Sequence, residues 1–324
     1  MLVLSESQVQ SLIDIDELIA ALARAHVQYS TGKAVMPVRL VVPLPQIQGR
    51  ITSMPGYLTE DNALGMKVVT YFQDNPKRNL PAILATIMLF STETGKLIAA
   101  MDGGYITAIR TACASALATK ALANLETPTL GILGAGVQER AHIQALSRVR
   151  PLRRIRIYSP SGKSALTIKR EMEPLGVAIE AVTSAQEAVR DSDLIVTVTT
   201  AKEPIVKSAW LKAGAHINAV GSHRPDLREI DGATLKRAKV VVDSKDAIMA
   251  ECGDILLALK EQSITEADIH GEIGEVLAGA KPGRTSADEI TLYKSVGIAI
   301  QDVAAAQLVY RKALAQNVGT DVEI

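Results

Sequence analysis

Aromatic residues are scarce in this chain of 324 residues, at 3% with a single tryptophan. The apolar share of 48% consists mainly of Ala, Val, Ile and Leu, a mixture typical of helices packed on strands, and the length suffices for two domains. Charge of one sign is also missing, because 35 Lys and Arg residues balance 35 Asp and Glu residues. No basic field therefore favours nucleic acid as a partner, and no polybasic cluster favours an anionic membrane.

Long apolar runs, metal-binding patterns and cysteine pairs are absent from the sequence as well. The apolar runs are too short to span a bilayer, and "MLVLSESQVQ" lacks the basic start and cleavage region of a signal peptide, so we expect a soluble cytoplasmic protein. The two cysteines, Cys113 and Cys252, form no CxxC motif. Five scattered histidines without HExxH, and the lack of a nucleophilic triad, argue against metal chemistry and covalent catalysis.

The first third of the chain changes from helix to strand. Residues 5–33 have the pattern of one or two amphipathic helices, with a capping box from Ser5 to Gln8 and a stop at Gly32. This part predicts a mostly antiparallel or mixed sheet, since no helix intervenes between its strands and the turn "TETG" joins the last two. The predicted strands are 38–44, 50–58, 65–72, 83–91 and 96–102, followed by a helical pattern over 103–123.

After residue 128 the pattern alternates between strand and helix. Such alternation of apolar strands with helices predicts a parallel sheet covered on both faces, as in the doubly wound α/β fold that binds dinucleotides. Residues 291–316 then predict a strand or turn and a long helix that returns to the first domain. The six predicted strands are 129–133, 154–158, 177–182, 194–199, 215–220 and 239–244.

The turn "GAGVQE" follows the first of these strands and opens a helix. Gly134 allows the tight turn, and Gly136 lets a pyrophosphate approach the backbone at the helix N-terminus. Glu139 takes the third glycine position of the fingerprint, and the pattern alone also fits an ordinary strand–turn–helix. The predicted cofactor contacts here are Gly134, Ala135, Gly136, Val137 and Gln138.

No acidic residue ends the second strand, where one would bind the ribose 2′-hydroxyl of NAD. Ser159, Ser161 and Lys163 stand there instead, and hydroxyls with a cation suit a 2′-phosphate. The sequence therefore favours NADPH over NADH, with an ordinary polar loop as the alternative. Further cofactor contacts are predicted at the carboxyl ends of the fourth and fifth strands, at Thr199, Thr200, Val220 and Ser222.

Five segments together resemble the ornithine cyclodeaminase/µ-crystallin family, and the resemblance runs from about residue 2 to 312. They are "GMKVVTYF", "MDGGYITAIRTACASALATKAL", "GILGAGVQERAH", "HINAVGSHRPDLREID" and "YKSVGIAIQD". The resemblance implies a Rossmann-type NAD(P)-binding domain at 119–296, inserted in a discontinuous α+β domain of residues 1–118 and 297–324. That second domain would bind the substrate and form a homodimer.

The family's substrates are small amino or imino acids, so the site must hold a carboxylate. Arg39 and Arg110 match carboxylate-binding arginines of the family, and Lys67 matches a lysine close to the substrate. Taken singly each fits a surface cation, but an unpaired charge is unfavourable in the apolar strands that hold Arg39 and Lys67. Thr86 and Thr111 match positions near the cofactor, although threonine is also common in strands.

Three other positions match the family less simply. Asp302 matches an acidic residue at the start of the last helix, where it serves either catalysis or the helix dipole. Lys294 and Ser295 match a motif near the active site, and a structural role explains them adequately. His223 stands where ornithine cyclodeaminases carry an aspartate, which places the sequence nearer to ketimine reductases. This histidine either donates a proton to an imine or is a loop residue touching the cofactor.

The sequence thus predicts an enzyme that reduces a cyclic ketimine carboxylate, Δ1-pyrroline-2-carboxylate or Δ1-piperideine-2-carboxylate, with NAD(P)H. Arg39 and Arg110, aided by Lys67, would hold the carboxylate, and Lys67, His223 or a bound water would protonate the imine. The alternatives are an ornithine cyclodeaminase with bound NAD, an alanine or other amino acid dehydrogenase, and a non-catalytic binding protein like µ-crystallin. Three cations in one pocket favour chemistry over binding alone.

Overall fold

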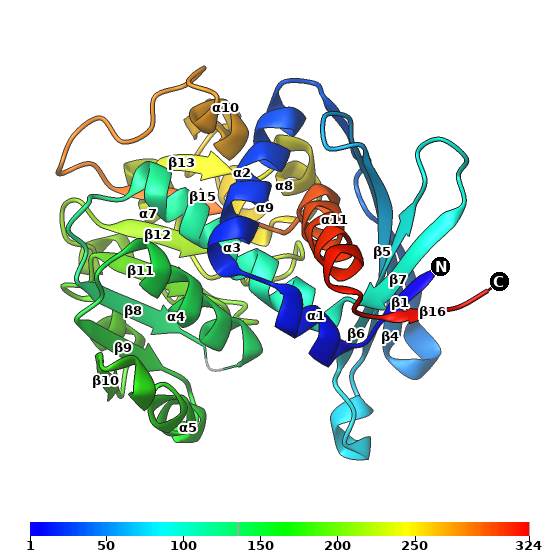
Figure 1. Cartoon of the computed structure of the whole chain (residues 1–324). Coiled ribbons are helices and arrows are strands. Elements are labelled where there is room, and N and C mark those ends of the chain that lie inside the picture. Colours follow the sequence, from blue (N-terminus) through cyan, green and yellow to red (C-terminus); the bar gives the residue numbers. More distant parts are fainter. Residues whose placement is uncertain (135, 324) are drawn as a thin grey trace. The chain divides into compact units, whose positions relative to one another are not determined.

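The computed structural model describes residues 1–134 and 136–323. It divides into two compact units, one made of Met1–Thr111 with Ile298–Ile324 and the other of Ala112–Gly297. Figure 1 shows the first unit combining the blue and cyan N-terminal segments with the red C-terminal helix. Among the described helices, none is both long and apolar enough to cross a membrane.

The first unit is built on a mixed sheet with the order β16-β1-β7-β6-β5-β4-β2, and β3 pairs with β4. The pairs β4–β5, β5–β6 and β6–β7 are antiparallel and β1–β7 is parallel, so the predicted mixed sheet is confirmed. The three shortest strands were not predicted, because two or three residues carry no readable alternation. The strands are β1 Leu2–Leu4, β2 Ala34–Val35, β3 Leu40–Leu44, β4 Gly49–Leu58, β5 Ala63–Phe72, β6 Ile83–Phe90, β7 Leu97–Asp102 and β16 Thr320–Asp321.

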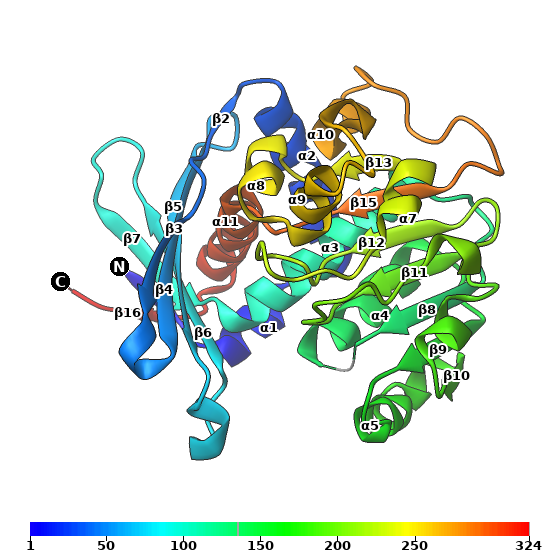
Figure 2. The ribbon, with the colours of Figure 1, turned by 180° about the vertical axis from the view of Figure 1, so that it is seen from behind.

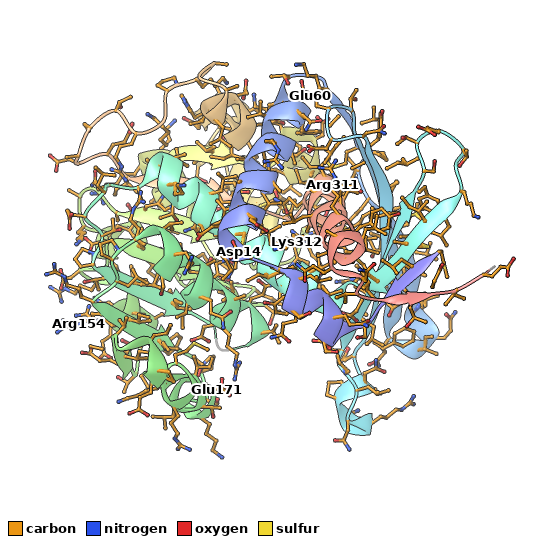
Figure 3. The ribbon with its side chains drawn as sticks, in the orientation of Figure 1. Asp14, Glu60, Arg154, Glu171, Arg311 and Lys312 are labelled. Carbon is orange, nitrogen blue, oxygen red and sulfur yellow. The ribbon has the colours of Figure 1, made fainter. Side chains whose placement is uncertain are left out.

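Helices α1 (Glu6–Leu12), α2 (Ile15–Ser30) and α11 (Ala299–Gln316) complete the first unit. The predicted capping box at Ser5 is present. Helix α11 packs on α2 and on strands β4, β5 and β6, as Figure 2 shows. On its outer side Lys312 donates to Glu17 of α2 at 2.7 Å; Figure 3 labels this lysine. Helix α11, which comes from the C-terminal part of the chain, therefore packs on a sheet whose strands come mainly from the N-terminal part.

Helix α3 (Gly104–Leu122) begins in the first unit and continues into the second. The described residues of the second unit form a sheet of eight parallel strands. The order is β10-β9-β8-β11-β12-β15-β13-β14, and Figure 1 shows β10 to β12 in succession. All six predicted strands are present, but β14 was missed and β15 lies between β12 and β13. The strands are β8 Thr129–Leu133, β9 Arg154–Tyr158, β10 Ala178–Ala181, β11 Leu194–Thr197, β12 His216–Ala219, β13 Lys239–Val242, β14 Ile269–Glu272 and β15 Thr291–Lys294.

The chain order of this sheet defines one switch point. From β8 the chain proceeds to β9 and β10 on one side and later to β11 and β12 on the other. Open sheets of this kind bind ligands at the carboxyl ends of the strands, beside such a point. The helices of the unit beyond α3 are α4 Val137–Val149, α5 Lys163–Glu171, α6 Ala185–Val189, α7 Gly232–Arg237, α8 Lys245–Glu251, α9 Gly253–Lys260 and α10 Ile273–Leu277.

Candidate active site

A buried ion pair joins β5 to α11 in the first unit. Lys67 lies in the middle of β5 and is 1% exposed, and Asp302, in the first turn of α11, is fully buried. The lysine Nζ lies 2.8 Å from each carboxylate oxygen of Asp302. Residues two apart in a strand point to the same face, so Lys67 shares a face of β5 with Gly65. A Cβ added at Gly65 would stand 3.3 Å from Val303 of α11, which shows that α11 covers this face. Asp302 thus pairs with a cation and does not serve the helix dipole alone.

Arg110 reaches the same carboxylate from α3. Its Nε donates to Asp302 Oδ1 at 3.0 Å, and its Nη1 donates to Gln301 Oε1 at 2.5 Å. The amide of Gln301 lies 3.1 Å from His26 Nε2. Because the amide oxygen faces the guanidinium, the amide nitrogen donates to the histidine, which leaves the ring proton on Nδ1. Gln301 and His26 were missed by the sequence reasoning, since neutral side chains on helices form no motif.

The charges of this cluster are unequal. Lys67 and Arg110 share one carboxylate, so the cluster carries an excess positive charge whenever the amine is protonated. Burial lowers the pKa of Lys67 to about 7, against the opposing effect of Asp302, and the nearby charges of Arg110 and Arg39 lower it further. Burial likewise lowers the pKa of His26 to about 4, so the imidazole is neutral. Lys67 can therefore exchange a proton near neutral pH.

The other predicted residues of the first unit occupy more open positions. Arg39 precedes β3 and is half-buried, which corrects the expectation that it lies inside an apolar strand. Thr86 is exposed on β6. Thr111 is buried on α3, where its hydroxyl donates to Thr107 O at 2.7 Å.

The predicted phosphate turn of the second unit follows β8. Gly134 has φ 126°, a conformation that favours glycine, and an added Cβ would stand 2.8 Å from Val198. At Gly136, the N-cap of α4, an added Cβ would meet nothing within 4 Å among the described atoms, and no described side chain caps this helix. Val137 is 68% exposed, and Gln138 follows it in the first turn. Ala135 lies outside the described residues.

The loop after β9 carries Ser159 and Ser161 and leads into α5; it is called the serine loop below. Ser159 is buried, and its Oγ has no hydrogen-bond partner in the described part of the chain. Gly162 has φ 65° and turns the chain into α5, which begins at Lys163 without a side-chain cap among these residues. Ser161 and Lys163 are exposed. A buried hydroxyl and an uncapped helix N-terminus suit an anion.

The segments after β11 and β12 hold the remaining predicted contacts. Thr200 is exposed and Val220 is half-buried. His223 is half-buried, with Nδ1 2.8 Å from Gly221 O. Two other positions face protein groups: the hydroxyl of Thr199 donates to Glu229 at 2.8 Å, and that of Ser222 donates to Leu227 O at 2.7 Å. Glu229 was missed by the sequence reasoning.

Lys294 and Ser295 hold buried carboxylates at the end of β15. Lys294 Nζ lies 3.0 Å from Asp254, and both residues are fully buried. Ser295 donates to Asp243 at 2.8 Å, and the same Asp243 oxygen accepts the backbone N–H of Gly297 at 2.8 Å. These contacts support the structural explanation of the motif. Over residues 1–134 and 136–323, no cluster of His, Cys, Asp and Glu could hold a metal ion.

The chain is similar to known proteins over most of its length. Residues 1–317 match the family model of the ornithine cyclodeaminase/mu-crystallin family. The chain is 36% identical to the Delta(1)-pyrroline-2-carboxylate reductase of Bacillus cereus, over 100% of both chains. It is 40% identical to the ketimine reductase mu-crystallin of Rattus norvegicus, over 90% of this chain and 91% of that one.

Two solved structures share the whole fold. One is the Delta(1)-pyrroline-2-carboxylate reductase of Thermococcus litoralis in complex with NADH and L-proline, with a TM-score of 0.96, 43% identity and coverage of 99% of this chain and 100% of that one. The other is an archaeal alanine dehydrogenase dimer with bound NAD, with a TM-score of 0.94, 38% identity and coverage of 100% and 99%. Each of these two structures therefore resembles this chain along almost its full length.

Proposed function

The chain belongs to the ornithine cyclodeaminase/mu-crystallin family, and on that premise we propose that it reduces a small cyclic imine carboxylate to the cyclic L-amino acid with NADPH. Δ1-Pyrroline-2-carboxylate and Δ1-piperideine-2-carboxylate are the substrates of the required size and charge. The proposal draws on two relatives that are named as reductases of such imines and on a structure that holds NADH with L-proline.

The buried cluster of Lys67, Arg110 and Asp302 is the observation that carries this proposal. Two cations and one carboxylate leave one positive charge unbalanced, and the carboxylate of the substrate would neutralise it. Nε and Nη1 of Arg110 are occupied, so Nη2 is the edge of the guanidinium that binds the substrate. Arg39, which already influences the pKa of Lys67, provides the second guanidinium.

Lys67 is the proposed proton donor. Its pKa of about 7 leaves the amine partly neutral without substrate. A bound carboxylate raises the pKa of this amine, because a nearby anion favours the charged form. Lys67 is therefore protonated in the complex and places a proton at the imine nitrogen, while Asp302 holds the ammonium in position. When bound, the reduced nicotinamide supplies the hydride for the imine carbon.

The second unit fits a dinucleotide. The open space at Gly136 and the N-terminus of α4 suit the pyrophosphate. We assign NADPH because Ser159, Ser161 and Lys163 follow β9, where hydroxyls and a cation would bind the 2′-phosphate and a carboxylate would repel it. The orphaned Ser159 hydroxyl supports this assignment. His223 and Thr200 stay candidates for contacts to the cofactor.

We also propose a homodimer formed through the first unit. An archaeal alanine dehydrogenase of the same fold is a dimer. Large apolar side chains on β3, on β4 and at the start of β6 are exposed here, with Leu40 at 64% and Ile83 at 50%. Such a concentration of exposed apolar surface is typical of an interface. Its other members include Val35, Val38, Val41, Val42, Ile47, Ile51, Leu80 and Leu84.

The test is a comparison of reactions with purified protein. Pyrroline-2-carboxylate with NADPH should give rapid nucleotide oxidation without release of ammonia. Ammonia from L-ornithine with NAD⁺ would instead identify a cyclodeaminase, and faster turnover of pyruvate with ammonia and NADH would identify an alanine dehydrogenase. Arg110→Ala should raise the KM for the imine by about 100-fold or more while the Kd of NADPH stays the same. If Arg110→Ala weakens binding of the imine and of NADPH equally, the role given to Arg110 is contradicted.

A further inference from the structure

Glu229 is a fully buried carboxylate with four close donors. Its Oε1 accepts the backbone N–H of Thr199 at 2.7 Å and the hydroxyl of Thr199 at 2.8 Å. Its Oε2 accepts the hydroxyl of Thr197 at 2.8 Å and the backbone N–H of Gly221 at 2.7 Å. Thr197 ends β11, and Gly221 comes two residues after the end of β12. One side chain therefore connects the carboxyl ends of two adjacent strands.

The backbone around this carboxylate is packed too closely for any residue but glycine. A Cβ on Gly221 would stand 2.1 Å from Thr199 O and 2.4 Å from Glu229 Oε1. Val198, the residue before Thr199, is equally close to the turn after β8: a Cβ on Gly134 would stand 2.8 Å from Val198 O. The segments that follow β8, β11 and β12 consequently meet at the switch point of the sheet, and Glu229 fixes the spacing of two of them.

A second buried carboxylate holds Glu229 in place. The backbone N–H groups of Glu229 and Ile230 donate to Asp254 Oδ1 at 2.7 and 2.9 Å. Asp254 pairs in turn with Lys294 at 3.0 Å. Burial raises the pKa of Glu229, and the charge of Lys294 opposes this effect. With its four donors, the carboxylate has the environment that an ionised group requires inside a protein.

The position of these segments relative to the cofactor follows from the topology. The pyrophosphate turn lies after β8 and the serine loop after β9. In a doubly wound fold the adenosine half of a dinucleotide lies on the β9 side, so the nicotinamide half lies over the ends of β11 and β12. Those are the two ends that Glu229 connects.

We propose that Glu229 is a positioning residue of the cofactor site, which sets Thr199 and the backbone at Gly221 in the arrangement that binds the nicotinamide half. The inference rests on the function proposed above, because it assumes a dinucleotide at this edge. A residue with a purely structural role would contribute to stability and leave nucleotide affinity unchanged, and this difference makes the inference testable.

The experiment measures binding of NADPH and of NADH from nucleotide fluorescence, without imine, for the wild type and Glu229→Gln. A glutamine has one acceptor oxygen, so its amide NH₂ would face the N–H of Thr199 or of Gly221, donor against donor. We expect the Kd of both nucleotides to rise by about tenfold or more. The KM for the imine at saturating NADPH should change by less than about twofold, because the carboxylate site lies on other residues.

Two further variants complete the design. Glu261→Gln is the matched control, since Glu261 binds Arg228, the neighbour of Glu229, and is half exposed; its nucleotide affinity should equal that of the wild type. Thr197→Val removes one donor to Glu229 at a buried strand end and should raise the Kd by about threefold, which keeps the test open if Glu229→Gln does not fold.

Unchanged nucleotide affinity in Glu229→Gln or, if that variant does not fold, in Thr197→Val would overturn the inference and leave Glu229 a structural residue. An equal rise of the Kd in Glu261→Gln would overturn it as well, because the effect would then be unspecific. Failure of the wild type to bind either nucleotide would overturn the proposed cofactor site and this inference with it. A fourth outcome is distinct from these three: if the wild type binds nucleotide but does not reduce the imine, only the proposed reaction is contradicted.

Discussion

Replacing Lys67 by methionine separates the two effects that its buried amine should have, on catalysis and on stability. Methionine keeps the length and the apolar stem of the side chain but removes the charge and the proton. General acids of this kind contribute about 10²–10⁴ to a rate, so kcat should fall by about 100-fold or more. In the wild type kcat/KM should fall as the pH rises through about 7, where the amine loses its proton.

The same substitution should stabilise the fold near neutral pH. The pKa of Lys67 is about 7 in the folded chain against an ordinary value of 10.5, so the unfolded chain binds an extra proton between these values. The contribution of Lys67 to the unfolding free energy is therefore most favourable above pH 10.5 and becomes less favourable as the pH is lowered from there to about 7. The burial costs about 4 kcal/mol at pH 7 and about 1 kcal/mol at pH 9.5. Lys67→Met removes this cost, but it also removes the hydrogen bond to Asp302. The loss of that bond lowers the unfolding free energy of the variant by about 1.5–3 kcal/mol at either pH.

The assay is urea unfolding of the wild type and Lys67→Met at both pH values, together with initial rates of NADPH oxidation across the same range. The difference in unfolding free energy between the two proteins should change by about 3 kcal/mol from pH 7 to pH 9.5. A pH-independent difference would show that the pKa of the amine is not lowered in the folded chain. A variant that retains the fall of kcat/KM near pH 7 would refute Lys67 as the donor and favour His223.

Three other substitutions test neighbouring parts of the argument. Gln301→Glu adds a carboxylate beside Arg110 and should raise the KM for the imine by about tenfold or more without altering the Kd of NADPH; an unchanged KM would contradict the excess-charge argument. Ser159→Asp places an anion at the serine loop and should turn the nucleotide preference from NADPH to NADH by about tenfold or more in kcat/KM, whereas an unaltered ratio would place the 2′-phosphate elsewhere. If the protein is the proposed dimer, Leu40→Lys should convert it to a monomer in sedimentation velocity, and a persistent dimer would exclude this surface as the interface.

The fold could be predicted to a large extent because its signals are local. Short runs rich in β-forming residues marked β4 to β7, and near-continuous apolar runs marked β8 to β13. β14 was missed because "IHGE" is short and polar, and its strand state depends on pairing with β13. The place of β15 between β12 and β13 is a tertiary property that its own four residues do not encode.

The candidate site could be predicted only in part, for a related reason. Lys67, Arg110 and Asp302 were each found through the motifs around them, but the pairing of both cations with this one carboxylate was not, because Asp302 follows Lys67 by 235 residues. Glu229 stands in "RPDLREID", where it resembles its charged neighbours, and only burial distinguishes it from exposed Asp226. Burial is set by the whole fold, so a charged residue that becomes internal has no local signature.

The discontinuity of the first unit affects how the protein can be made. While the ribosome synthesises the chain, Lys67 emerges early and lacks its counter-ion until α11 has been translated, after the entire parallel sheet. Until then α11 does not cover the face of β5 that carries the lysine, so its amine remains in water and keeps its proton near neutral pH. A nascent chain stalled before residue 299 should therefore contain a folded second unit and an unfinished first one, and the cluster of Lys67, Arg110 and Asp302 should form only with the final helix.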